Sequence, residues 1–157
     1  VNIHQKPSST ELANIAIGVA QNAKKLGFIP KVAILSYSNF GNPSGSNTKT
    51  INECLKILED KKVSFEFDGE MTAEVALDYN LIKENYPFCK LSGPANVLIM
   101  PDLYSANISF KLLQKMENLS VIGPIMIGGN NPFQIIQMGA SVSDIVNSAC
   151  ISTYNSL

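Results

Sequence analysis

The chain has 157 residues, of which 45% are hydrophobic and 16% are charged, and its formal net charge is −1. This is enough apolar material for one compact domain with a real core. Because the lysines are scattered, nucleic acid and anionic membranes are poor candidates for partners. The chain shows neither a membrane-length apolar run nor a signal peptide pattern, so we expect a cytoplasmic protein.

Cysteine, histidine and arginine usage narrows the chemistry further. The three cysteines stand far apart without a C-x-x-C pair, and the only histidine is His4, so the sequence predicts neither a disulfide framework nor a metal site. All twelve basic residues are lysines, so the chain lacks the planar guanidinium group that grips phosphates and carboxylates. Because the first residue is Val1 rather than Met, we expect a fragment of a longer polypeptide.

The first predicted elements are a helix and a buried strand. Ser8 and Glu11 form the S-x-x-E capping pattern, which opens a helix that ends at Gly27. The apolar run 32–36 predicts a strand that leads into a polar loop over 39–47. The expected apolar face of the helix consists of Leu12, Ile15, Ala16, Val19, Ala23 and Leu26.

A second helix and strand follow. Apolar spacing predicts a helix with Cys54 on its core face, and residues 64–67 alternate as a strand does. We interpret Asp68 and Glu70 as residues of a turn or a helix start, although a carboxylate pair for acid/base work or metal binding is the alternative. A short helix is expected over 73–77.

The C-terminal third continues the alternation. Residues 96–100 predict a strand that stops at Pro101, and a helix carries Ile108, Leu112 and Met116. Pro124 interrupts the apolar run 121–127. The last helix is expected to begin near Ser141 and to turn Ile145, Ala149 and Thr153 inward.

Strands that alternate with helices predict an α/β fold, a three-layer α/β/α lobe with a mostly parallel sheet that spans residues 1–157. Ligands of such sheets bind beyond the carboxyl ends of the strands. The loops that meet this description are 36–47, 101–107 and 128–141.

Five segments carry a resemblance to a known family: PKVAILSYSNFG (30–41), DGEMTAEVAL (68–77), LSGPANVLIMPDLYSANI (91–108), IGPIMIGG (122–129) and GASVSDIVNSA (139–149). In order and spacing they resemble the phosphate acetyl/butyryltransferase family. The resemblance covers nearly the whole chain and corresponds to the C-terminal half of that family's two-lobed domain. It implies an isocitrate-dehydrogenase-like lobe whose missing N-terminal lobe completes a cleft for acyl phosphate and coenzyme A (CoA).

Two positions distinguish the branches of this family. Stand-alone phosphotransacetylases typically read S-x-S-T-(K/R)-G where this chain has S-Y-S-N-F-G, a pattern similar to the transferase-like C-terminal region of NADP-dependent malic enzymes. Active phosphotransacetylases typically read L-S-R-G where this chain has I-Q-M-G over 136–139. The resemblance thus implies that Gln137 and Met138 replace a serine and a charge-stabilising arginine.

The resemblance implies a set of site residues. Asp144 matches the aspartate thought to take the thiol proton, but the Ser141-x-x-Asp144 spacing is equally a helix capping box. The implied ligand-binding residues are Ser36, Ser38, Asn39, Gln137, Met138, Gly139 and Ser141. The first three of these residues either contact CoA or acyl phosphate or only shape a loop.

Three functions remain open at this stage. We expect foremost a catalytically weakened module of a malic enzyme that senses acetyl-CoA and supports assembly into a homo-oligomer, with the malic domain upstream. The second is an active phosphate acetyltransferase that exchanges acetyl between acetyl phosphate and CoA. The third is a dimerisation domain without a ligand. None requires a covalently bound cofactor or a metal, and CoA or acetyl-CoA acts as substrate or effector.

Overall fold

The computed structural model of the chain describes residues 5–43, 46–117, 119–129 and 133–155, with the backbone alone for Ser46, Asn47 and Asn155. It divides into two compact units, an N-terminal unit (4–106) and a C-terminal unit (107–157 with 1–3), and each is described by itself. The prediction of one lobe over the whole chain stays a prediction. None of the described helices combines the length and apolar character that a membrane crossing requires.

The N-terminal unit is built on a parallel sheet with strand order β2-β1-β3. The strands are β1 (Lys31–Leu35), β2 (Glu66–Met71) and β3 (Val97–Ile99). Ile34 pairs with Gly69 and Leu35 pairs with Met71, so Glu70 is the extra residue of a β-bulge. A bulge of this kind re-aims a side chain at the end of a strand.

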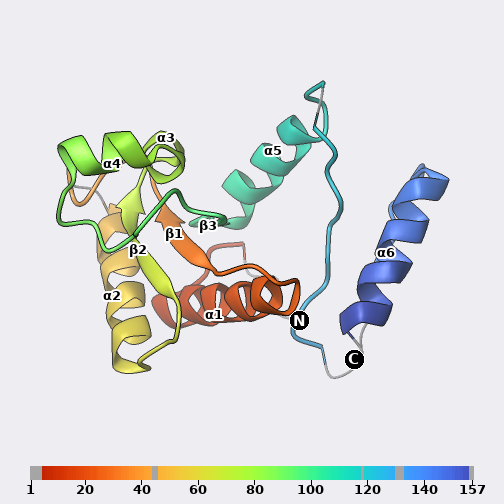
Figure 1. Cartoon of the computed structure of the whole chain (residues 1–157), viewed down its shortest axis with the longest axis horizontal. Coiled ribbons are helices and arrows are strands. Elements are labelled where there is room, and N and C mark those ends of the chain that lie inside the picture. Colours follow the sequence, from red (N-terminus) through yellow and green to blue (C-terminus); the bar gives the residue numbers. More distant parts are fainter. Residues whose placement is uncertain (1–4, 44–45, 118, 130–132, 156–157) are drawn as a thin grey trace. The chain divides into compact units, whose positions relative to one another are not determined.

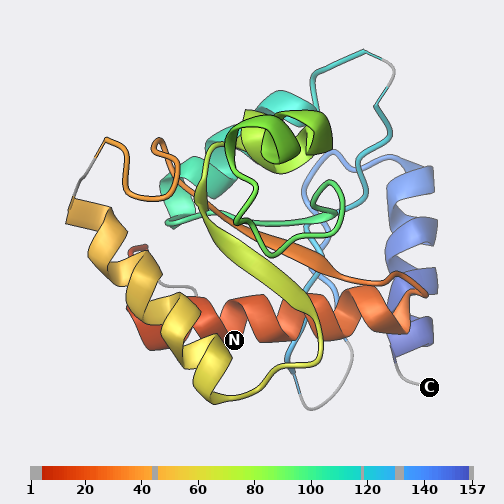
Figure 2. The ribbon, with the colours of Figure 1, turned by 60° about the vertical axis from the view of Figure 1, so that its left-hand side comes forward.

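Two helices cover each face of this sheet, as Figures 1 and 2 show. On one face α1 (Ser9–Lys25) and α2 (Ser46–Asp60) pack against Val32 and Ile34 of the central strand. On the other face α3 (Ala73–Leu77) and α4 (Tyr79–Asn85) enclose a second core with Ala33 and Leu35. Successive side chains of β1 therefore point to opposite faces of the sheet and enter two separate cores. The predicted three-layer α/β/α architecture with a parallel sheet is confirmed.

Helix α1 begins and ends where the sequence predicts. The Ser8 side chain accepts from the backbone N–H of Glu11, and the Glu11 side chain accepts from the backbone of Ser8, which completes the capping box. The predicted apolar face was partly wrong, because Ile15 is 41% exposed and Leu26 is 40% exposed. The buried stripe instead consists of Leu12, Ala13, Ala16 and Ala20. The small alanine side chains allow a close approach of this face to its neighbours.

The interpretation of Asp68 and Glu70 as turn or helix-start residues was wrong, because both lie within β2 and are buried. Each carboxylate accepts long-range hydrogen bonds: Asp68 Oδ2 accepts from the backbone N–H of Lys90 at 2.7 Å, and Glu70 Oε1 accepts from Ser38 Oγ at 2.6 Å. Turn-forming residue types therefore gave a misleading signal here. The short helix over 73–77 is confirmed as α3, whereas α4 was not predicted.

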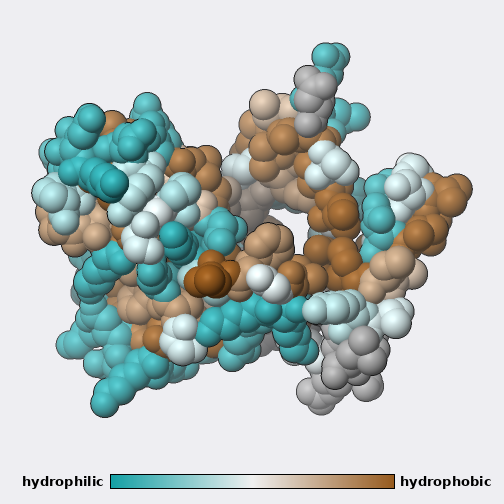
Figure 3. Space-filling view, viewed as in Figure 1, coloured by the Kyte–Doolittle hydropathy of each residue, from teal (hydrophilic) through white to brown (hydrophobic). Residues whose placement is uncertain are grey.

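The C-terminal unit includes most of α5 (Leu103–Leu113) and all of α6 (Val142–Asn155). Residues 119–129 have no regular structure, and the Gln134 side chain accepts from the backbone N–H of Met126 at 2.9 Å. Ile145, Ala149 and Thr153 are exposed, so the predicted inward face of α6 was wrong. No described side chain beyond residue 100 is buried, and Figure 3 shows mostly brown, hydrophobic surface over α5 and a mixture of brown, white and teal over α6.

Candidate functional site

The residues predicted for a site fall into two groups, one in each unit. The first group follows β1 directly and includes Ser36, Ser38 and Asn39. The second group precedes and opens α6. Parts of the predicted loops, residues 44–45 and 130–132, lie outside the described residues.

Hydrogen bonds to β2 hold the first group. The backbone N–H of Ser36 donates to Met71 O at 2.9 Å, which extends the strand pairing by one residue. The Asn39 side chain accepts from the backbone N–H of Thr72 at 2.8 Å. Asn39 and Asn42 also exchange two backbone hydrogen bonds, at 3.1 and 3.0 Å. The loop therefore has a defined shape that depends on the end of β2.

The bulged residue Glu70 is the central support of this loop. Its side chain is 1% exposed, and its Oε1 accepts hydrogen bonds from Ser38 Oγ at 2.6 Å, Gly41 N at 3.1 Å and Thr48 Oγ1 at 3.2 Å. Its Oε2 is buried and has no hydrogen-bond partner among the described residues. Buried carboxylate oxygens are usually paired, so burial of this oxygen costs free energy.

Phe40 anchors the turn of the same loop. Its backbone has a φ of 49°, a conformation that is uncommon for a bulky residue, and its N–H donates to Glu70 O at 2.7 Å. Its ring centroid lies 5.1 Å from that of Tyr86 and 4.9 Å from that of Phe88. Aromatic packing and the hydrogen bond together hold the backbone in this conformation.

Sequence reasoning missed Glu70 and Thr72 as supports of the loop. Glu70 acquires its role from a bulge and from donors 22 to 32 positions away in the chain. The only local signal was the alternation over 64–67, which continues into β2 if Gly69 is tolerated in a strand.

The second group centres on Gln137, Met138 and Gly139. Met138 is fully exposed, and Gly139 has a φ of 86°, which favours glycine. Gln137 Oε1 accepts a hydrogen bond from Lys111 Nζ at 3.2 Å. The ammonium group of Lys111, on α5, thus lies beside the loop in which the family resemblance places a serine and an arginine. This cation was not predicted from the sequence.

Asp144 and Ser141 form a capping box at the start of α6. Asp144 Oδ2 accepts from the Oγ and the backbone N of Ser141, at 2.8 and 2.9 Å, and the Asp144 N–H donates to Ser141 Oγ at 3.2 Å. The hydrogen bond from the Ser141 hydroxyl, and after it the backbone bond, lowers the pKa of Asp144. A lower pKa makes a carboxylate a weaker base at neutral pH. The capping interpretation is therefore confirmed, while the role as base stays a prediction.

The described residues offer neither a metal-ligating cluster nor, at Cys54 and Cys89, an activated thiol. The described part of the chain contains no group of three or more His, Cys, Asp or Glu side chains placed to hold a metal ion. Burial raises the pKa of Cys54 to about 12 and that of Cys89 to about 11. Both thiols therefore stay protonated and unreactive at neutral pH.

Comparison with known proteins decides the family. Residues 1–153 match the family model described as phosphate acetyl/butaryl transferase. The chain belongs to this family. The resemblance inferred from the five sequence segments is thereby confirmed.

Two curated relatives represent the two branches of the family. The chain is 50% identical over 153 residues to an NADP-dependent malic enzyme of Rhizobium meliloti (strain 1021), which covers 98% of this chain and 20% of the relative. It is 39% identical over 146 residues to a phosphate acetyltransferase of Helicobacter pylori (strain J99), which covers 93% of this chain and 28% of the relative.

A solved structure agrees with the fold. A phosphotransacetylase from Streptococcus pyogenes superposes with a TM-score of 0.89 at 31% sequence identity, over 99% of this chain and 47% of that protein. The chain thus spans less than half the length of each of these family members.

Proposed function

We propose that this chain is the catalytically weakened, acetyl-CoA-sensing and assembly module of an NADP-dependent malic enzyme. The 50% identity to such an enzyme over 98% of the chain supports this branch over the stand-alone transferases. In this proposal the malate and nicotinamide sites lie in another part of a longer cytoplasmic polypeptide, and the module forms homo-oligomers. Its ligand is CoA or acetyl-CoA, bound without a covalently attached cofactor.

The observation that carries the proposal is the loop with Gln137 and Met138. Attack of a thiol on an acyl phosphate needs compensation for the charge on the phosphate and on the developing oxyanion. Met138 is fully exposed and offers neither charge nor donor, and the Gln137 carbonyl oxygen already accepts from Lys111. Loss of one preorganised donor costs on the order of a hundredfold to a thousandfold in rate.

The same hydrogen bond supports a second candidate, an active phosphate acetyltransferase. The Lys111 ammonium beside Gln137 is a cation within the chain itself, and it offers a substitute for the arginine. In this reaction the thiol sulfur of CoA forms a bond to the acetyl carbon of acetyl phosphate. The carbon–oxygen bond to phosphate breaks, and the thiol proton passes to Asp144 and then to the departing phosphate.

Formation of acetyl-CoA from acetyl phosphate and CoA by the complete natural polypeptide separates the two candidates. If the chain is the weakened module, we expect no formation of acetyl-CoA, or a slow formation whose rate Met138→Arg increases about a hundredfold. The active transferase predicts turnover that falls when Lys111 becomes Met and when Asp144 becomes Asn. Turnover that depends on both residues would overturn the leading proposal.

Sensing is tested by the stability of the same polypeptide as acetyl-CoA is added. A ligand that binds the folded state alone stabilises it by about 2.7 kcal/mol at a hundred times its dissociation constant. The sensing module predicts such a shift without turnover. A dimer that shows neither a shift nor turnover would instead favour the third interpretation, a domain for assembly alone.

A further inference from the structure

In the loop after β1, the distances between polar atoms determine which groups donate hydrogen bonds and which accept them. Gly41 N–H is a donor under all conditions, and it lies 3.1 Å from Glu70 Oε1, so this oxygen acts as an acceptor. Ser38 Oγ lies 2.6 Å from the same oxygen and therefore donates its proton to it.

The direction of the Ser38 hydrogen bond determines that of the Ser36 hydrogen bond. A serine hydroxyl has one proton, and that of Ser38 is directed to Glu70. Ser36 Oγ lies 3.2 Å from Ser38 Oγ, so in this pair Ser36 is the donor and Ser38 the acceptor. With its own proton directed inward, Ser36 presents only oxygen lone pairs to its surroundings.

Burial decides which serine a ligand reaches. Ser38 is 1% exposed, whereas Ser36 is half-buried at the carboxyl end of the central strand, where ligands of parallel sheets bind. Asn39 Oδ1 accepts from the backbone N–H of Thr72 at 2.8 Å and is held against the end of β2. Of the two serines, Ser36 is therefore the hydrogen-bond acceptor that a ligand reaches.

We infer that Ser36 is a specificity-determining residue that accepts a hydrogen bond from CoA, and that this loop binds CoA and not the acyl phosphate. Dianionic acetyl phosphate has neither an N–H nor an O–H group to donate, whereas CoA has the amide N–H groups of its pantetheine arm and, when it is not acylated, a thiol. The inference rests on the proposed function and assigns one of its ligands to one loop.

Binding of CoA, acetyl-CoA and acetyl phosphate to the complete natural polypeptide, measured by calorimetry, tests this inference. The variant is Ser36→Ala, and the matched control is Ser9→Ala, at a half-buried serine in the first turn of α1. Loss of one neutral hydrogen bond should weaken CoA binding roughly two- to tenfold in Ser36→Ala, with acetyl phosphate unchanged. An equal effect on acetyl-CoA would assign the bond to an amide N–H, and an effect on CoA alone to the thiol.

Ser38 is a positioning residue, because it holds the proton of Ser36 inward. The Ser38→Ala variant should therefore change ligand preference, which a general loss of structure would not do. In Ser38→Ala the Ser36 proton has no inward acceptor and becomes free to donate outward. The preference for CoA over acetyl phosphate should therefore narrow, while Ser36→Ala in the same background should then weaken both ligands. Circular dichroism of each variant establishes that the fold is retained.

The outcomes distinguish failure of the proposed function from failure of the role assigned to Ser36. Failure of the natural polypeptide to bind either CoA or acetyl-CoA would overturn the proposed function and this inference with it. Wild-type CoA binding that Ser36→Ala leaves unchanged would overturn the inference alone. A loss of acetyl phosphate binding in Ser36→Ala, in the presence of Ser38, would also overturn it, because Ser36 would then be a donor.

Discussion

Among single residues, Glu66 shows how hydrogen bonds from one neighbour lower the pKa of a carboxylate. Its Oε2 accepts from the backbone N–H of Ser92 at 2.9 Å, and its Oε1 accepts from the Ser92 hydroxyl at 2.8 Å. The backbone bond is the largest cause that lowers the pKa of Glu66, and the hydroxyl bond and Lys31 add to it. These bonds join the first residue of β2 to the segment before β3.

We predict that the contribution of Glu66 to stability depends on pH. Because its pKa is lowered on folding, the contribution is present above the pKa of the unfolded chain and is lost as the pH falls through the folded value. In Ser92→Ala the backbone bond remains, so the pKa should move only part of the way back. NMR titration of the Glu66 carboxyl carbon measures both values, and an unaltered pKa in the variant would contradict the assignment to the hydroxyl.

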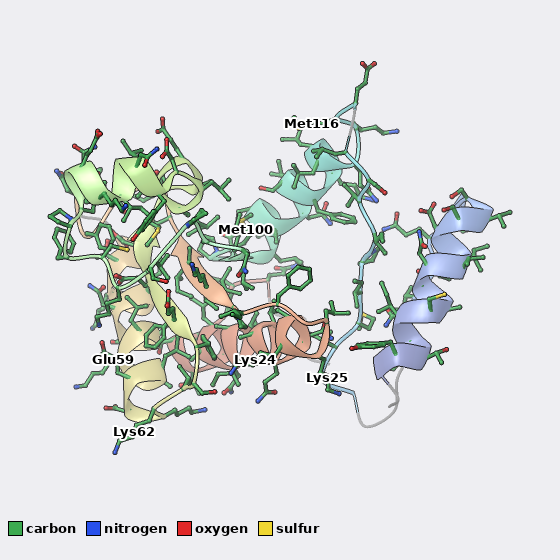
Figure 4. The ribbon with its side chains drawn as sticks, viewed as in Figure 1. Lys24, Lys25, Glu59, Lys62, Met100 and Met116 are labelled. Atoms are coloured by element: carbon green, nitrogen blue, oxygen red, sulfur yellow. The ribbon has the colours of Figure 1, made fainter. Side chains whose placement is uncertain are left out.

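At the scale of elements, α1 and α2 end in the same way with different residues. Each helix closes with a pair of hydrogen bonds, from Gly27 N and Phe28 N in α1 and from Lys62 N and Val63 N in α2. This is the Schellman arrangement, in which one residue takes a left-handed conformation. Gly27 has a φ of 88°, whereas Lys62, labelled at the end of α2 in Figure 4, has a φ of 49°.

Lys62→Gly should therefore stabilise the protein by about 1 kcal/mol, because glycine adopts a left-handed conformation without the clash of a Cβ atom. The control is Lys56→Gly, at an exposed position inside α2, which should destabilise by about 0.5–1 kcal/mol. Urea unfolding of both variants gives the two free energies. Opposite signs for the same substitution would confirm the interpretation, and a destabilised Lys62→Gly would contradict it.

Gly69 is required by the close approach of β1 and β2 at the bulge. A Cβ atom on Gly69 would lie 2.8 Å from Ile34 O and 3.0 Å from Ile34 Cβ. Gly69→Ala should therefore cost about 1–3 kcal/mol, because the strands have to separate. It should also displace Glu70 and weaken CoA binding. Unchanged thermal stability would show that the bulge absorbs the methyl group.

The sequence predicted the elements whose signals are local. Capping at Ser8, the stop at Gly27 and the apolar run of β1 each depend on neighbouring residues, and all three are confirmed. The residues 68–70 were misassigned because Asp and Gly favour turns unless tertiary contacts use them otherwise. Ser36 and Ser38 were found as candidates, but their polarity comes from Glu70, a partner that neither spacing nor composition reveals.

At the scale of the whole molecule, burial is unevenly distributed. All buried hydrophobic side chains among the described residues lie between Leu12 and Ile99. We predict that amide protons of β1 exchange slowest with solvent and those of residues 119–129 fastest, because opening a segment without buried side chains costs little free energy. Hydrogen exchange followed by mass spectrometry measures this order. Equal protection of both segments would contradict this prediction.

The order of the strands in the sheet also has a consequence for the path of folding. Lys31 pairs with Glu66, about 35 positions later, whereas Val32 pairs with Val97, about 65 positions later. Closing the longer loop costs roughly 0.5 kcal/mol more chain entropy, so β1, α2 and β2 should assemble before β3 adds to the other edge. The bulge that aims Glu70 at Ser38 belongs to this early pair of strands, so the loop is shaped before the sheet is complete.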